Sequence, residues 1–210
     1  MKAKHRVVVM DQVLAITFYP VIADALLLAT NRKAAQHSAR APPEKNNPIH
    51  LELFMISPEA LMQLAIEQAQ KGIYQGQSPF GCAIAIGDRI IVATHNHVLA
   101  HTDITAHAEI QALRLACQSE QRIFLDGAHV ATTCEPCPMC MTALHWARVD
   151  TVYYGASIAD AKQAGFNELR LSAQQVLEIG GSSVKLIQGV CEQSCRDLFS
   201  QWLKHNPQAY

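Results

Sequence analysis

The sequence predicts an α/β fold in which one mixed sheet lies between two layers of helices. Three observations carry this prediction. The chain has 210 residues, of which 50% are hydrophobic and 17% charged, and this is enough to bury the core of one globular domain. Short runs rich in β-branched residues alternate with segments of helical periodicity. A hairpin comes first and helix and strand units follow, which favours a mixed sheet covered on both faces.

The first element of this domain is a helix that begins at Pro58. Ser57 suits the N-cap, Pro58 suits the first turn, and apolar residues recur at helical spacing after them. The preceding residues 31–48 are polar and contain three prolines, which predicts a linker. We therefore place the domain at residues 55–210. Residues 1–54 are expected to be a dispensable extension and linker, or alternatively the product of an upstream start codon.

Five strands and three further helices are predicted after this first helix. Gly87 and Asp88 separate two short apolar runs and indicate a hairpin. Strands are expected at residues 82–86, 90–94, 129–133, 151–155 and 184–188. Helices are expected at residues 105–117, 138–147 and 191–203. Because helix N-termini lie beside strand ends in such folds, we expect the reactive side chains there.

Charge and hydropathy narrow the class of protein. The net charge is −1 overall, and residues 55–210 hold 10 basic and 14 acidic groups. Such a domain lacks the overall positive charge of a nucleic-acid-binding protein, so small uncharged or cationic substrates are favoured, although a local basic groove remains an alternative. Acidic residues and Pro20 interrupt the apolar stretch at residues 7–29, which argues against a membrane span and against a secretory signal.

The cysteines point to metal or redox chemistry in a reducing compartment, and therefore to a cytoplasmic protein. There are seven of them, and two form the motif Cys137-x-x-Cys140. Together with His107 these cysteines offer three zinc ligands and leave the fourth tetrahedral position to water, as in catalytic zinc sites. Glu109 lies two residues after His107. It is therefore well placed to move protons without binding the metal.

Each half of this pattern also has a simpler interpretation. Cys-x-x-Cys alone is typical of a structural zinc half-site or a redox pair, and His107-Ala108-Glu109 alone is typical of a solvated helix turn. No second cysteine pair follows at zinc-finger spacing. The two halves together match His-x-Glu followed by Pro-Cys-x-x-Cys, the signature of zinc-dependent nucleobase deaminases. Over about residues 57–170 the chain resembles the cytidine deaminase superfamily.

The resemblance extends to one branch of that superfamily. Residues 105–110, Thr-Ala-His-Ala-Glu-Ile, and residues 135–140, Glu-Pro-Cys-Pro-Met-Cys, are similar to the branch of bacterial guanine deaminases and tRNA-specific adenosine deaminases. Ile104 departs from that branch, which usually has proline there. The resemblance implies a three-layer α/β/α cytidine-deaminase-like fold with a mixed five-stranded sheet. It also implies one Zn²⁺ per subunit and a homodimer.

Within this branch, several residues are more similar to those of guanine deaminases than to those of tRNA-specific adenosine deaminases. Trp146 is followed by Ala147 and Arg148 as in those enzymes, and Glu168 occupies the position of an acidic residue that touches the purine. Glu168 is one methylene longer than the usual aspartate. Asn96 precedes Asp103 by seven residues, as does the base-binding asparagine of the branch. Tyr210 matches a last tyrosine that closes the neighbouring active site in those enzymes.

We therefore expect a zinc-dependent hydrolase that deaminates a purine base, converting guanine to xanthine and ammonia. Glu109 is the expected catalytic residue, and four residues are expected to contact the base: Asn96, Glu168, Trp146 and Phe80. Trp146 equally fits a core position, and Phe80 equally fits a plug of the hairpin. The alternatives are deamination of adenosine in tRNA, and of cytosine or a nucleoside. A non-catalytic zinc or nucleic-acid-binding module is less consistent with the presence of Glu109.

Overall fold

A computed structural model describes residues 56–205, 207, 209 and 210 of the chain. The expectation for residues 1–54, an extension and linker, lies outside these described residues. The predicted start of the domain at Met55 lies next to the first described residue.

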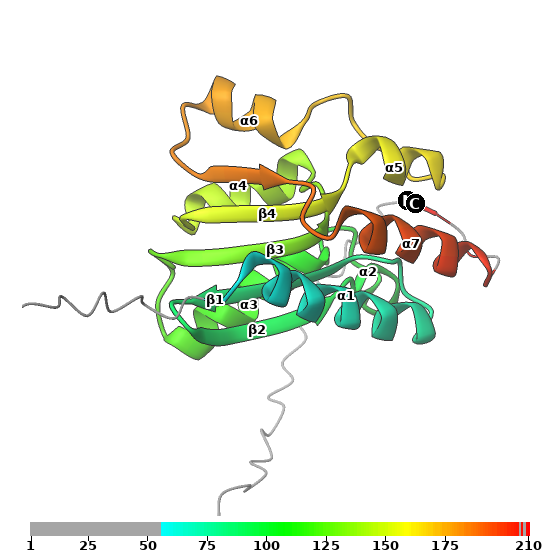
Figure 1. Ribbon diagram of the computed structural model, residues 1–210, viewed down its shortest axis with the longest axis horizontal. Coiled ribbons are helices and arrows are strands. Elements are labelled where there is room, and N and C mark those ends of the chain that lie inside the picture. Colours follow the sequence, from blue (N-terminus) through cyan, green and yellow to red (C-terminus); the bar gives the residue numbers. More distant parts are fainter. Residues whose placement is uncertain (1–55, 206, 208) are drawn as a thin grey trace, which may run out of the picture. The chain divides into compact units, whose positions relative to one another are not determined.

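The described residues form seven helices and five strands, and the strands make one sheet (Figure 1). The helices are α1 Pro58–Tyr74, α2 Val98–His101, α3 Ala108–Glu120, α4 Pro138–Trp146, α5 Ile158–Gln163, α6 Ala173–Gly180 and α7 Glu192–Leu203. The strands are β1 Gly81–Ile86, β2 Arg89–His95, β3 Ala128–Cys134, β4 Thr151–Ala156 and β5 Lys185–Gln188. The strand order is β2-β1-β3-β4-β5.

The sheet is mixed, as predicted. Strand β1 pairs antiparallel with both β2 and β3, whereas β3 with β4 and β4 with β5 are parallel. The parallel strands β3 and β4 therefore end at the same edge of the sheet, where Cys134 pairs with Ala156. The zinc motif follows directly after this edge.

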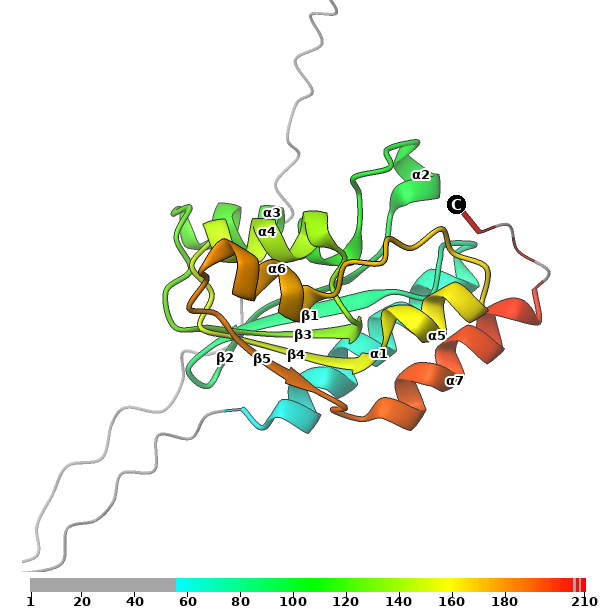
Figure 2. The ribbon, with the colours of Figure 1, turned by 90° about the horizontal axis from the view of Figure 1, so that it is seen from above.

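Helices cover both faces of the sheet (Figure 2). Side chains alternate along β1, so that Ala83 and Ala85 pack in one cluster with α1 and α7, whereas Cys82 and Ile84 pack in the other with α3, α4 and α6. Helix α7 packs closely against β4 at Gly155. A Cβ atom added to this glycine would overlap Sγ of Cys195, so the absence of a side chain permits the close approach. The predicted three-layer α/β/α arrangement is confirmed.

Most of the predicted elements are present, with shifted ends. Ser57 accepts a hydrogen bond from the Ala60 amide and caps α1 as expected. The helix predicted from residue 105 begins only at Ala108, because the amide and hydroxyl of Thr105 both donate to Asp103 in a preceding turn. Helices α2, α5 and α6 were not predicted.

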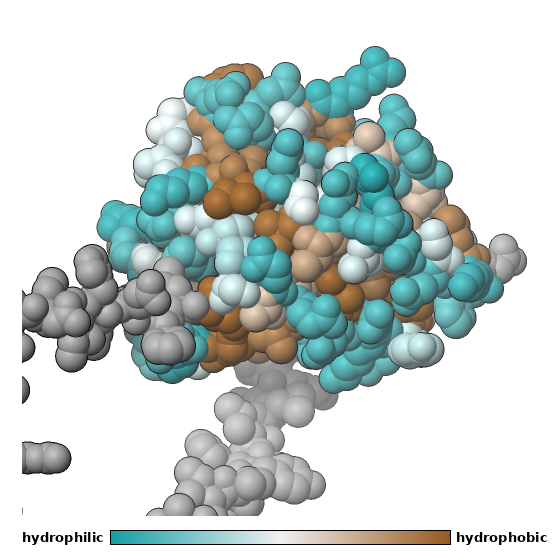
Figure 3. Space-filling view, viewed as in Figure 1, coloured by the Kyte–Doolittle hydropathy of each residue, from teal (hydrophilic) through white to brown (hydrophobic). Residues whose placement is uncertain are grey.

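The surface of the described part is mixed in character. Hydrophilic side chains cover much of the face seen in Figure 3, with smaller hydrophobic areas between them. None of the helices in residues 56–205 combines the length and the apolar composition that crossing a membrane requires.

Candidate active site

Three predicted zinc ligands meet where two helices begin. His107 is the N-cap of α3, Cys137 is the N-cap of α4, and Cys140 lies in the first turn of α4. The Nδ1 atom of His107 lies 3.5 Å from Sγ of Cys140 and 3.7 Å from Sγ of Cys137. The ligand atoms of the three residues all lie within 4.8 Å of one another.

This spacing fits a tetrahedral zinc ion. Zinc binds thiolates at about 2.3 Å and imidazole nitrogens at about 2.0–2.1 Å, so tetrahedral ligands lie about 3.5–3.8 Å apart. The distances from His107 match this geometry. Two thiolates and one imidazole leave one position free, which is the ligand set of a catalytic rather than a structural site.

The electrostatics of the site favour a thiolate at Cys137. A hydrogen bond from Cys140 and the nearby His107 lower the pKa of the Cys137 thiol to about 4. Burial lowers the pKa of His107, but its hydrogen bond with Cys137 and the charge of Glu109 outweigh burial and leave it raised. Cys137 also stands at a helix N-terminus, which stabilises negative charge.

Glu109, in the first turn of α3, lines the same pocket as the candidate ligands His107 and Cys137. Its carboxyl group is buried, and burial raises its pKa above the usual range. The hydroxyl of Thr132 on β3 donates to Oε1 of Glu109 over 3.2 Å. A buried carboxyl group with a raised pKa next to a metal site holds its proton to a higher pH than an ordinary glutamate does, which suits a group that takes up and releases protons.

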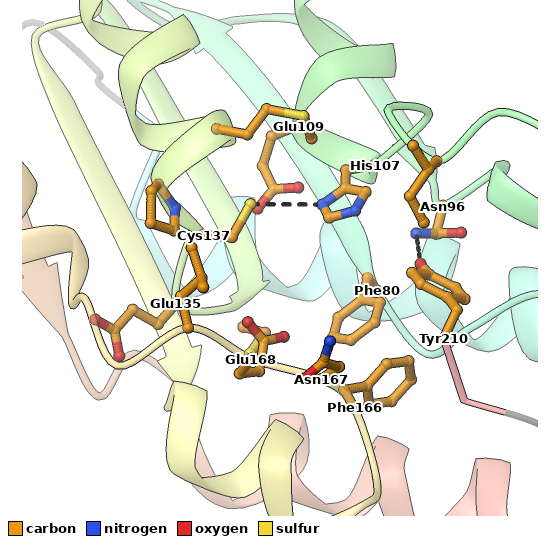
Figure 4. Close-up of a pocket in the computed structure, with 15 residues that line it drawn as sticks. Phe80, Asn96, His107, Glu109, Glu135, Cys137, Phe166, Asn167, Glu168 and Tyr210 are labelled. Carbon is orange, nitrogen blue, oxygen red and sulfur yellow. Dashed lines mark hydrogen bonds between the residues drawn. The ribbon is translucent and has the colours of Figure 1, made fainter.

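A cavity of about 340 Å³ opens onto these residues (Figure 4). Ligand sites occupy about 300–1,000 Å³, so this one suits a small ligand. Aromatic and aliphatic side chains line it together with a few polar groups. The lining residues are Phe80, Asn96, Ile104, His107, Glu109, Cys134, Glu135, Cys137, Pro138, Met139, Phe166, Asn167, Glu168, Leu169 and Tyr210.

Asn96 is fully buried at the end of β2 and contributes its side-chain amide to the pocket. Its Oδ1 accepts a hydrogen bond from the amide of Val98 over 3.0 Å, which fixes the orientation of the side chain. Its Nδ2 donates to the hydroxyl of Tyr210 over 2.7 Å. The structure therefore places Tyr210 in the pocket of its own chain, whereas the resemblance implies a tyrosine that closes a neighbouring site.

Glu168 and Phe80, which the sequence predicts to contact the base, also line the pocket. Burial, followed by the charge of Cys137, raises the pKa of the half-buried Glu168 carboxyl group. Phe80 packs edge-on against Phe166, with 4.9 Å between the ring centroids. Phe80 therefore serves both the pocket wall and the core, so its two predicted roles are compatible.

Trp146 is not brought to this pocket, and the structure corrects that prediction. Helix α4 begins at the metal site and ends at Trp146, so nine residues separate the tryptophan from Cys137 by roughly 13 Å. The Trp146 side chain is 71% exposed and borders a different hollow, with Phe124 and Asp126. It belongs neither to the pocket wall nor to the core.

Comparison with known proteins agrees with this geometry. The pattern described as "Cytidine and deoxycytidylate deaminase zinc-binding region" matches residues 55–156. Guanine deaminase of Bacillus subtilis is 40% identical over 111 residues, which are 52% of this chain and 71% of that protein. The chain belongs to the cytidine and deoxycytidylate deaminase family. This confirms the predicted resemblance and makes the protein a zinc-dependent hydrolytic deaminase.

Guanine deaminases and tRNA-specific adenosine deaminases are both among the other proteins to which this deaminase is similar. The tRNA-specific adenosine deaminase of Bacillus subtilis is 31% identical over 150 residues, 71% of this chain and 91% of that protein. A solved structure of guanine deaminase from Nitrosomonas europaea is 25% identical, has a TM-score of 0.64 and covers 70% of this chain and 84% of its own. The fold and the reaction class are therefore those of the family, and both groups inform the choice of substrate.

Two residues with roles in the site of this deaminase were missed in the sequence. Thr132 contacts Glu109, and Glu135 accepts hydrogen bonds from the amides of Ile158 and Ala173. Glu135 directly precedes the predicted Pro136-Cys137 turn, so its position in the motif was the one available signal. Thr132 carried no signal, because only the packing of α3 against the sheet brings Glu109 to it.

Proposed function

We propose that this deaminase hydrolyses guanine to xanthine and ammonia. The observation that carries the proposal is the Glu168 carboxylate in a small, largely apolar pocket beside the metal ligands. A carboxylate is an acceptor only, so it favours a base that presents ring N–H donors, as guanine does. A base with a ring acceptor at that position would leave the carboxylate unpaired, which costs more than a mere lack of contact.

His107, Cys137 and Cys140 would hold one zinc ion per subunit. A zinc ion in such a site acts as a Lewis acid that lowers the pKa of water toward neutrality. Glu109 takes one proton from the attacking water and gives it to the ring nitrogen beside the amino-bearing carbon. It then transfers the second proton of that water to the departing amine, so that ammonia leaves.

Asn96 and Phe80 orient the base. The Nδ2 atom of Asn96 carries two N–H groups, of which one donates to the Tyr210 hydroxyl, so the other can donate to a carbonyl oxygen or ring nitrogen of the base. Its Oδ1 accepts from the Val98 amide, which fixes the orientation of the side chain. Phe80 and Phe166 give the pocket an aromatic wall, which suits a planar ring and excludes water. The polar side chains of Asn96 and Glu168 and this aromatic wall would together define the edge and the plane of the substrate.

Deamination of adenosine in tRNA is the second candidate. It is supported by the relative of that name, of which the match covers 91%. Against it stands the net charge of residues 55–210, since binding to RNA relies on basic residues that contact phosphates. Tyr210 in the pocket also favours a free base over a polynucleotide. The cytoplasm is the expected location, and a homodimer the expected assembly.

Ammonia release by the full-length, zinc-loaded protein tests these candidates. The panel contains guanine, adenine, cytosine, cytidine, guanosine and a tRNA anticodon stem-loop, with Glu109→Gln as the blank. Turnover of guanine above the other five supports the proposal. Turnover of the stem-loop with none of guanine would contradict it and support the second candidate.

A further inference from the structure

The residue before the zinc motif ties together two helices from opposite faces of the sheet. The backbone amide of Glu135 continues the β3 and β4 pairing by donating to the carbonyl of Ala156 over 2.8 Å. Its carboxylate accepts hydrogen bonds from the amide of Ile158 over 3.2 Å and from the amide of Ala173 over 2.9 Å. Ile158 and Ala173 are the first residues of α5 and α6.

The amides of Ile158 and Ala173 are donors that the capping boxes of their own helices do not satisfy. Ser157 and Asp160 form a reciprocal capping box at α5, and Ser172 and Gln175 form one at α6. Each box satisfies the amides of the N-cap and of the third helical residue. The amide of the first residue lacks a partner within its own helix, and Glu135 supplies an acceptor to both.

The charge of Glu135 is balanced by the same helix ends. Among residues 56–205, none of the ion pairs involves this carboxylate. The N-termini of helices carry partial positive charge, so a carboxylate between two of them is stabilised. Figure 4 shows the Glu135 carboxylate turned away from His107 and Asn96, which indicates that it acts through the protein and not on the substrate.

The segment between the two helices carries part of the pocket. Residues 164–172 connect α5 to α6, and Asn167, Glu168 and Leu169 within it line the cavity. Ala161 of α5 packs in the cluster of α1 and α7, whereas Ala173 of α6 packs in the cluster of α3 and α4. The segment therefore crosses from one layer to the other at the carboxyl edge of the sheet, as Figure 2 shows.

We propose that Glu135 is a positioning residue that holds the N-termini of the two helices flanking segment 164–172, and so sets Glu168 relative to Cys137. Glu135 lies two residues before Cys137, so one side chain links the metal-binding turn to the substrate-binding segment. This inference deepens the proposed function and rests on it for the identity of the substrate. Loss of the link moves Glu168 and weakens substrate binding, while the three metal ligands stay in place.

Glu135→Gln in the full-length, zinc-loaded protein is the test. An amide oxygen can accept one of the two bonds, but the amide nitrogen then faces the other N–H, so one helix end is released. We expect KM for guanine to rise about tenfold, the loss of a charge-assisted hydrogen bond, with a smaller fall in kcat and full zinc content. Glu178→Gln, on the exposed side of α6, is the matched control and is expected to change none of these values.

A second measurement and a second variant keep the test independent of the substrate. Hydrogen exchange of the amides of residues 158–173 is expected to become faster in Glu135→Gln. Ile158→Pro removes one donor and leaves Glu135 intact, because proline suits the first helical position and Ser157 is already extended. It is expected to change exchange and KM in the same direction by a smaller factor.

The exchange rate, KM and zinc content of the variants together support or overturn the positioning role of Glu135. Faster exchange with retained zinc supports the positioning role even if the wild-type protein does not turn over guanine, a result that would overturn only the proposed function. Unchanged exchange and unchanged KM in Glu135→Gln overturn the inference. Loss of zinc from this variant also overturns it, since Glu135 would then act on the metal-binding turn. Unchanged exchange in Ile158→Pro, with faster exchange in Glu135→Gln, would remove α5 from the link.

Discussion

The side-chain amide of Asn96 donates a 2.7 Å hydrogen bond to the hydroxyl of Tyr210. The same amide nitrogen is proposed to bind the base, so the tyrosine hydroxyl takes one of its two N–H donors and leaves the substrate only the other. Burial raises the pKa of Tyr210 to about 12, so the hydroxyl is neutral at physiological pH. Tyr210 also packs edge-on against Phe166, with 5.7 Å between the ring centroids.

Tyr210→Phe is therefore expected to lower KM for guanine. The substitution keeps the ring contact with Phe166 and frees the Asn96 amide, and one neutral hydrogen bond corresponds to roughly a threefold to tenfold change. Steady-state kinetics measure the effect. Tyr74→Phe is the matched control, because Tyr74 is 83% exposed on α1. A raised KM in Tyr210→Phe would indicate that the hydroxyl binds the substrate instead of competing with it.

Glu109→Gln is expected to bind zinc fully and to lose at least about 10²-fold in kcat, the lower end of the range for general acid and base catalysis. Glutamine has nearly the same shape and keeps an acceptor for the Thr132 hydroxyl, but it cannot accept the proton of the attacking water. Metal analysis and ammonia release measure the two effects. Glu67→Gln, on the exposed side of α1, is the control. Turnover of Glu109→Gln near the wild-type rate would refute the shuttle.

The grouping of the three candidate zinc ligands was predictable because their signal is local. His107, Cys137 and Cys140 each sit at the start of a helix, and Pro136 and Pro138 mark one of these starts in the sequence. The sheet was predictable from short alternating runs for the same reason. Trp146 was wrongly assigned although the information was available, since a residue at the far end of a helix that begins at the metal site is one helix length away.

The two helices and the contacts of Glu135 that the sequence analysis missed were missed for different reasons. Helices α5 and α6 do carry a local signal, because Ser157 and Asp160, like Ser172 and Gln175, have the spacing of a capping box. The contacts of Glu135 with Ile158 and Ala173 span 23 and 38 residues. They depend on how two layers of helices meet at one sheet edge, which periodicity and motif spacing do not specify.

Deletion of residues 1–54 is expected to leave kcat and KM unchanged. The prediction rests on the polar, proline-containing stretch at residues 31–48 and on the start of α1 at Pro58, capped by Ser57. Comparison of the shortened and full-length proteins in ammonia release and thermal unfolding tests it. Aggregation of the shortened protein, or a lower unfolding temperature, would refute the expectation that the extension is dispensable.

The affinity for guanine is expected to fall as the pH is lowered, beginning at a higher pH than an ordinary glutamate would dictate. Burial and the charge of Cys137 raise the pKa of the Glu168 carboxyl group. Only the ionised form accepts from ring N–H groups with both oxygens, so protonation below that raised pKa removes an acceptor and raises KM.

The profile of KM against pH measures this effect, and Glu168→Gln is the decisive variant. This variant is expected to have a higher KM than the wild type at neutral pH. Its KM is expected to lack the rise on acidification that protonation of Glu168 causes, since glutamine does not titrate. Glu168→Asp keeps the carboxylate and is expected to retain the acid limb, with a KM between those of the wild type and Glu168→Gln. An acid limb that persists unchanged in Glu168→Gln would assign the titration to another group and remove Glu168 from base recognition.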